Sequence, residues 1–137
     1  MMRYEKVTNQ DVERLREICG KDAVLWQDAI SPDYSHDELS LERFAPELVV
    51  LPQSAHEVAE ILAHCYERNI PVTPRGSGTG LCGGAMALHG GVILVTTKMD
   101  RILEIDQENL VAVVEPGVLL MELQAQVEKL DLFYAPD

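Results

Sequence analysis

The sequence predicts an α+β fold, a small parallel β-α-β unit followed by mixed or antiparallel strands and a helix. Apolar residues 48–51 precede an amphipathic stretch, 55–68, and a second apolar run, 71–74. Strand, helix, strand in this order favours a right-handed crossover with parallel pairing. Short apolar segments then follow one another closely, which favours hairpins. An amphipathic stretch at 118–130 predicts the last helix.

Residues 1–45 are expected to form an N-terminal helix and an acidic loop. Thr8 with Asp11 three positions later is typical of a helix N-cap, and apolar residues recur at helical spacing over 9–19. The short apolar run 23–26 is compatible with a strand. The sequence of 27–45 is polar and acidic, and we expect a solvated loop there.

The β-α-β unit has clear boundary signals. Ser54 and Glu57 form a capping box at the start of the expected helix, and Asn69 suits the left-handed conformation that ends it. The strands at 48–51 and 71–74 are expected to pair in parallel through this helix. The carboxyl end of the second strand leads into a loop, at the edge where open α/β sheets bind ligands.

That loop is rich in glycine. Five of the nine glycines lie between Gly76 and Gly84, and glycine adopts positive φ and allows a ligand to approach the backbone. Consecutive amides of such a loop can converge on an anion, above all on phosphate. No Asp or Glu occurs between Arg68 and Met99, although the chain has 23 of them. We interpret the loop as an anion site; plain tight turns beside a buried strand are the alternative.

Gly78 to Gly83 match the pattern G-x-G-x-x-G, but their context differs from a Rossmann loop. A Rossmann loop opens directly into a long helix, whereas here Gly90, Gly91 and a strand follow too soon. The P-loop is excluded because no Gly-Lys-Ser/Thr follows. The loop is therefore expected to hold its anion with its own amides, without a helix behind them.

Three apolar segments, 91–96, 101–106 and 110–115, are expected to be strands, the last two joined as a hairpin. Glu115-Pro116-Gly117 is typical of a turn. The helix expected at 118–130 has one apolar face, formed by Leu119, Leu123, Val127 and Leu130.

Composition excludes several classes of function. A net charge of −12 argues against nucleic acid and against anionic lipid as partners. No segment has the length of a membrane span or the pattern of a signal peptide. Cys19, Cys65 and Cys82 match no disulfide or zinc pattern, so we expect no metal site and a reducing, cytoplasmic location.

Several stretches resemble one known family. Pro74 to Gly84 resembles the pyrophosphate loop of FAD-linked oxidases with a PCMH-type FAD-binding domain, the vanillyl-alcohol oxidase superfamily. The glycolate oxidase subunit GlcD and D-lactate dehydrogenase group is the most similar. Segments 46–52, 69–72, 115–117 and 134–137 fit the same family in order. The resemblance implies that 46–137 form the N-terminal part, or first lobe, of such a domain, incomplete and without its substrate domain.

The resemblance also implies a set of residues that bind FAD. The amides of 76–80 would hold the pyrophosphate, and Arg75 would add positive charge or brace the loop. The expected cofactor-binding residues are Pro74, Arg75, Gly76, Ser77, Gly78, Thr79, Gly80, Cys82, Gly83, Glu115, Pro116, Gly117, Pro136 and Asp137.

The chain departs from the family pattern at position 82, where Cys replaces the usual Ser. We interpret Cys82 as a neutral small residue, with a redox or covalent-flavin role as the alternative. Relatives that bind FAD covalently through this loop carry a His near position 79, and this chain has Thr there. The resemblance therefore implies noncovalent FAD.

The implied function is FAD binding, as the N-terminal portion of a flavin-dependent 2-hydroxy-acid dehydrogenase or oxidase of the glycolate or D-lactate type. The redox chemistry of such enzymes belongs to the flavin, which accepts a hydride equivalent. The family continues well beyond residue 137, so no catalytic residue is named, and the missing remainder or companion subunits are the expected partners. A truncated or separate small module without activity of its own is the alternative.

Overall fold

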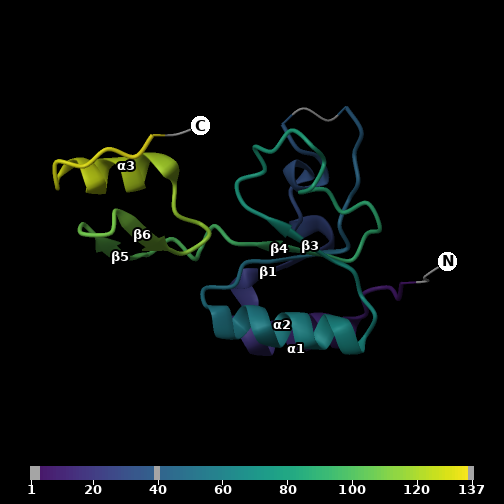
Figure 1. Ribbon diagram of the computed structural model, residues 1–137. Coiled ribbons are helices and arrows are strands. Elements are labelled where there is room, and N and C mark those ends of the chain that lie inside the picture. The colour runs from purple at the N-terminus through teal and green to yellow at the C-terminus, as the bar shows by residue number, and fades with distance from the viewer. Residues whose placement is uncertain (1–3, 39–40, 136–137) are drawn as a thin grey trace.

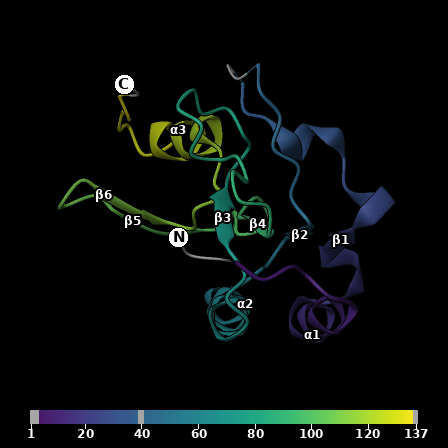
Figure 2. The same cartoon turned by 90° about the vertical axis from the view of Figure 1, so that its right-hand side faces the viewer.

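The computed structural model describes residues 4–38 and 41–135. Its main part is a four-stranded sheet in the order β1-β2-β4-β3. These strands are β1 (Val24–Trp26), β2 (Leu48–Val50), β3 (Val72–Arg75) and β4 (Val92–Val95). β1 runs antiparallel to β2, whereas β2, β4 and β3 run parallel. The helices α1 (Asn9–Cys19) and α2 (Ala55–Glu67) lie side by side against one face of the sheet (Figures 1 and 2).

A second, smaller unit, a hairpin covered by one helix, follows β4. β5 (Ile102–Asp106) and β6 (Val111–Val114) form the expected antiparallel hairpin, and α3 (Leu120–Glu128) lies along it (Figure 1). α3 is shorter than the helix expected at 118–130. Leu119 occupies its N-cap in an extended conformation and without a capping side-chain hydrogen bond, so Val118 and Leu119 lie outside the helix. Leu123 and Val127 are the buried part of its apolar face.

The expected direct pairing of the first two parallel strands is wrong, because β4 lies between β2 and β3. All four residues of β4 are buried, whereas β3 is largely half-buried and contains Pro74. A proline has no amide to donate to a neighbouring strand, so it is tolerated at a sheet edge and not at its centre. The most apolar strand thus takes the centre, although β2 and β3 remain parallel members of one sheet.

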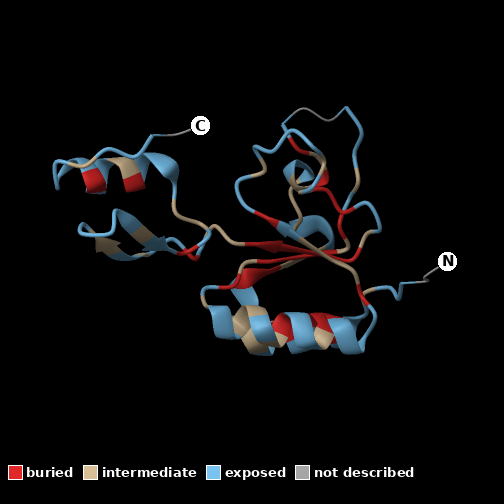
Figure 3. Ribbon diagram, viewed as in Figure 1, coloured by how far each residue is buried: buried red, intermediate tan, exposed pale blue. Residues whose placement is uncertain are grey.

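The core lies on both faces of this sheet. Leu48 and Val50 of β2 face α1 and α2, together with buried Leu15 and Ile61. Val49 points to the opposite face, where Ile93, Val95 and Ala87 are buried with it. Figure 3 shows the buried residues concentrated in the central strands and on the sheet-facing sides of the two helices. Loops and short 3-10 helices, with no long α-helix among the described residues, cover the second face (Figure 1).

The acidic segment 27–45 is not simply a solvated loop. It contains two short 3-10 helices, Gln27–Ala29 and Pro32–Ser35, and a second capping serine, Ser31. Ser35 and Asp37 are buried. The segment crosses the second face of the sheet, where partly buried Ile30 and Tyr34 pack against the core.

Two helices are joined through one buried carboxylate. Asp11 is 1% exposed and closes the capping box with Thr8 at the start of α1. The same carboxylate binds His64 and Arg68 at the end of α2, each at 2.9 Å. Burial alone would raise the pKa of Asp11, but its hydrogen bonds, that of Arg68 foremost, lower the pKa from its ordinary 3.8 to about 2.

Replacing Asp11 should weaken the fold and change its response to acid. Because the folded-state pKa is depressed, the stabilisation is complete above about pH 4 and is lost as the pH falls toward 2. A shift of this size corresponds to about 2 kcal/mol. We expect Asp11→Asn to lower the free energy of unfolding by about 2 kcal/mol at pH 7 and to flatten its pH dependence between 4 and 2. Urea unfolding followed by Trp26 fluorescence measures both.

Glu13→Gln is the matched control for this prediction. Glu13 is an exposed acid on the same helix, paired with Arg16. Exposed pairs contribute less than about 1 kcal/mol. Equal losses in the two variants would contradict the importance assigned to Asp11.

Candidate functional site

The glycine-rich loop begins at the carboxyl edge of the parallel strands. The Arg75 carbonyl, at the end of β3, accepts a hydrogen bond of 2.9 Å from the amide of Thr96, which follows β4. A hollow of about 250 Å³ opens at this edge, between the two strand ends and the segment that contains the helix Pro32–Ser35. It is lined by Ser31, Asp33, Tyr34, Arg75, Gly76, Ser77, Val95 and Thr97.

The first half of the loop presents main-chain donors. Within the described residues, the amides of 76–80 donate no hydrogen bond to a protein acceptor. Gly76, Ser77, Thr79 and Gly80 are exposed, so water or a ligand can reach these amides. A run of unpaired amides beside a hollow provides donors for an anion without a charged side chain.

The side chain of Arg75 points back beneath the loop and is only 8% exposed. Its guanidinium donates to the carbonyls of Asp33 at 3.0 Å, His36 at 2.9 Å and Ala85 at 3.3 Å. It also lies 5.8 Å from the centre of the Tyr34 ring. These contacts make Arg75 a brace between two loops, one of the two roles anticipated for it.

Gly78 lies directly above this guanidinium. Its φ is +80°, and a Cβ built at this position would overlap the Arg75 guanidinium. A side chain would therefore meet both backbone strain and a steric clash. The need for glycine at position 78 comes from the packing of the loop on its own brace.

The acidic segment holds the loop from the other side. The amide of Gly83 donates to the carboxylate of Asp37 at 2.8 Å, and the amide of Glu38 donates to the carbonyl of Gly80 at 3.4 Å. The sequence places acids far from the glycine loop, but folding brings Asp37 onto it. Nothing in the local pattern around Asp37 signals this contact, because its partner lies 46 positions away.

The turn at 115–117 reaches the same edge of the sheet. The Gly117 amide donates to the Met99 carbonyl at 2.8 Å, and a Cβ at position 117 would overlap the Thr96 carbonyl. Glu115 is bound twice by the Arg101 side chain, at 2.7 and 3.1 Å. The hydrogen bonds of Arg101 lower the pKa of Glu115. Glu115 thus closes the base of the hairpin, while Gly117 fits tightly against the segment that leaves β4.

The other expected positions fall in different places. Cys82 is an exposed, free thiol in the second half of the loop. Pro136 and Asp137 lie outside the described residues. Among the described residues, no cluster of three or more His, Cys, Asp or Glu is arranged to hold a metal ion. The described part of the chain also contains no helix with the length and hydropathy of a membrane span.

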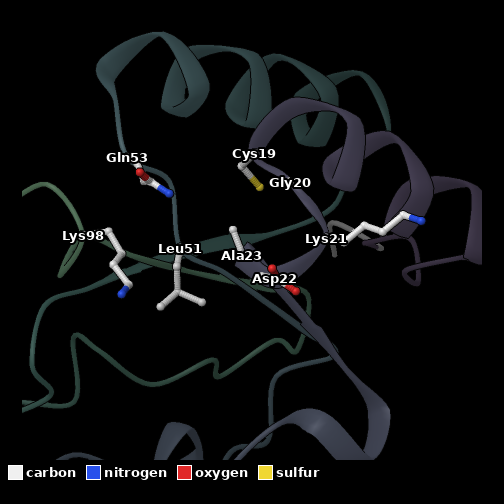
Figure 4. A pocket seen from close by; sticks show the side chains of 8 residues that line it. All are labelled: Cys19, Gly20, Lys21, Asp22, Ala23, Leu51, Gln53 and Lys98. Atoms are coloured by element: carbon white, nitrogen blue, oxygen red, sulfur yellow. The ribbon is translucent and has the colours of Figure 1, made fainter.

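A second hollow, of about 360 Å³, lies near the end of α1. Figure 4 shows its lining side chains, with Lys21 pointing away from Cys19 and Leu51. Burial raises the pKa of the Cys19 thiol to about 11, so the thiol is protonated and unreactive at neutral pH. Without convergent donors or a reactive group, this hollow is not the candidate site.

The parallel strands of the mixed sheet end beside a loop whose amides at 76–80, here called the amide arch, have no protein acceptor among the described residues. Such an arrangement suits a phosphate-bearing ligand. The chain belongs to a known family: residues 46–137 match the family described as FAD binding domain. The resemblance noted from the glycine loop and the 115–117 turn is thereby confirmed.

Individual relatives agree with this family. The chain is 45% identical over 135 residues to D-lactate dehydrogenase of Anaerostipes hadrus, covering 98% of this chain and 28% of that protein. It is 39% identical over 131 residues to glycolate oxidase subunit GlcD of Bacillus subtilis (strain 168), covering 96% and 28%. The fold matches substrate-bound p-cresol methylhydroxylase with a TM-score of 0.78 and 29% identity, covering 90% and 25%. The chain thus spans little more than a quarter of the length of these proteins.

Replacing Arg75 by lysine should show how far the brace supports the fold. Lysine keeps the charge, but a single ammonium cannot span carbonyls on both loops as a planar guanidinium does. We expect Arg75→Lys to lower the free energy of unfolding by about 2 kcal/mol, the loss of two or more hydrogen bonds. Urea denaturation measures this loss. Arg14→Lys, at an exposed arginine paired with Glu17 and Glu60, is the control and should change stability by less than about 0.5 kcal/mol. Similar values for both would show that Arg75 is not a brace.

Proposed function

We propose that the glycine loop is the part of this FAD-binding domain that holds the cofactor's pyrophosphate, through the amides of 76–80. The observation that supports this most directly is the run of unpaired amides beside the hollow at the carboxyl edge. A pyrophosphate carries about two negative charges, and main-chain donors can meet them without a lysine or arginine in contact. Arg75 supports the loop from beneath.

We assign the expected contact residues that the loop and the turn contribute to four groups. Gly76, Ser77, Gly78, Thr79 and Gly80 provide the amide arch. Pro74 and Arg75 fix its starting point at the end of β3. The turn Glu115-Pro116-Gly117 lies against the segment after β4, close enough to the same edge to border a bound cofactor. The amide of Gly83 is already bound to Asp37, so Gly83 contributes by shaping the loop.

We further propose that the cofactor is bound noncovalently and that the chain acts as the N-terminal portion of a 2-hydroxy-acid dehydrogenase or oxidase. FAD, when bound, supplies the group that accepts a hydride equivalent. This chain's own residues bind and orient it. The substrate class follows the relatives, one named D-lactate dehydrogenase and another glycolate oxidase subunit GlcD.

We also propose domain boundaries, a partner and a cellular location for the chain. Residues 46–137 form the first lobe of a PCMH-type domain, with 1–45 as an N-terminal addition that supports it. The partner is the further polypeptide that the longer relatives contain, in the same chain or in a companion subunit. Three free cysteines are in keeping with a cytoplasmic location.

Flavin content of the purified protein tests the proposal against its alternative, a small module without activity of its own. A protein that retains oxidised FAD is yellow, whereas a module that does not bind FAD is colourless. Titration of flavin-free protein with FAD then gives the affinity on which the variants below are compared.

Gly78→Val should weaken FAD binding at least tenfold in the protein at its full natural length. Backbone strain of about 1–3 kcal/mol at a positive φ, together with the clash against Arg75, disturbs the amide arch. Each 1.4 kcal/mol corresponds to a factor of about ten in affinity. Arg75→Ala should weaken binding less. Gly84→Ala is the control, because a Cβ there meets nothing within 4 Å. FAD affinity equal to wild type in Gly78→Val would make the loop a structural turn.

Cys82→Ser should leave FAD affinity nearly unchanged. Cys82 is exposed and has no disulfide partner, so its loss removes no buried contact. Flavin that survives acid precipitation in wild type but not in the variant would reveal a covalent link and contradict the proposal of noncovalent FAD.

A further inference from the structure

The segment 31–38, here called the strap, lies on the glycine loop and contacts it at several points. The carbonyls of Asp33 and His36 accept hydrogen bonds from the Arg75 guanidinium. The next two residues, Asp37 and Glu38, bind Gly83 and Gly80 in the second half of the loop. The strap therefore fixes the loop at its start and again at 80 and 83.

The loop needs such support because its own sequence provides little. Ordering each residue costs about 1–2 kcal/mol of conformational free energy, and glycine costs more than other residues. Leu81 is exposed, as are Cys82 and Gly84, so apolar packing does not hold the second half. Burial resumes only at Met86 and Ala87.

Asp37 supports the second half of the loop. The residue is 3% exposed, and a carboxylate is buried at a cost of several kcal/mol unless hydrogen bonds compensate. The bond to the Gly83 amide is charge-assisted, and such bonds are about twice as strong as neutral ones. Gly83 has a φ of +79°, so its peptide is held in a specific turn while Asp37 is bound.

We infer that Asp37 is a positioning residue for the cofactor: by binding the Gly83 amide it fixes the second half of the glycine loop and keeps the amides of 76–80 unpaired, with Gly76 and Ser77 at the hollow. This inference rests on the proposed function for its effect on FAD, but not for its effect on the loop. In this arrangement Gly80 and Gly83 contact the strap, whereas Gly76 and Ser77 line the hollow. The strap belongs to the part of the chain that precedes the matched domain region 46–137.

The direction in which FAD affinity changes when Asp37 is replaced separates a positioning role from a purely electrostatic one. Asp37 is an anion close to a site for an anion, so removal of its charge alone should tighten FAD binding. Loss of the support should weaken it. Asp37→Ala removes both charge and acceptor, whereas Asp37→Asn removes the charge and keeps a carbonyl oxygen that can accept from Gly83.

The experiment measures two quantities in wild type, Asp37→Ala and Asp37→Asn, all at full natural length. The first is amide hydrogen exchange across 76–84 in flavin-free protein, and the second is the dissociation constant for FAD. We expect exchange at Gly83 to be at least tenfold faster and FAD binding at least tenfold weaker in Asp37→Ala, with both values within about threefold of wild type in Asp37→Asn. Asp28→Asn, an exposed acid before the strap, is the control and should change neither.

Other results overturn the inference. FAD binding in Asp37→Ala that is as tight as in wild type, or tighter, would leave Asp37 without a positioning role. Fast exchange at Gly83 in wild type would show that the contact does not hold the loop. If wild type binds no FAD, the proposed function fails, and the exchange arm alone then decides: tenfold faster exchange in Asp37→Ala, reversed in Asp37→Asn, supports the strap, and unchanged exchange refutes it.

Discussion

The guanidinium of Arg75 joins three main-chain carbonyls from two segments that are remote in the sequence. Every residue has a main-chain carbonyl, so no local pattern marks these three acceptors. The buried cation holds the two segments together through them. Gly78 lies directly above the guanidinium with a φ of +80°, and a Cβ at this position would overlap Arg75. Both features require glycine. Arg75 thus holds the start of the glycine loop against the strap, and Asp37 and Glu38 add the contacts with Gly83 and Gly80.

The sheet places Arg75 at the end of an edge strand, directly before the glycine loop. β4 occupies the centre because it is buried on both faces, and β3 is left at the edge with its proline. The carboxyl ends of both strands then lie together, and Thr96 binds the Arg75 carbonyl. Gly117, between the hairpin and α3 of the smaller unit, packs against residues 96–99, which follow β4. Two motifs about forty positions apart thus meet at one edge of one sheet.

Local signals were sufficient for most secondary structure. The capping box of Thr8 and Asp11 and the left-handed Asn69 are present as expected, since both depend on bonds within a few residues. The hairpin of β5 and β6 is also local. Strand order was not predictable from adjacent segments, because it depends on which strand buries both of its faces. Asp37 was missed because a long-range side-chain contact leaves no periodic pattern.

The sequence by itself determined most of the helices and strands, the glycine loop and the family, because helix caps, apolar periodicity and a glycine-rich run with its flanking strand are encoded within short windows. Only the tertiary structure decided that Arg75 is a buried brace, that Glu115 is bound to Arg101, and that an acidic strap lies on the glycine loop. The physical reason is that burial and ion pairing depend on what surrounds a side chain in space. For charged residues in loops, those surroundings come from segments tens of positions away.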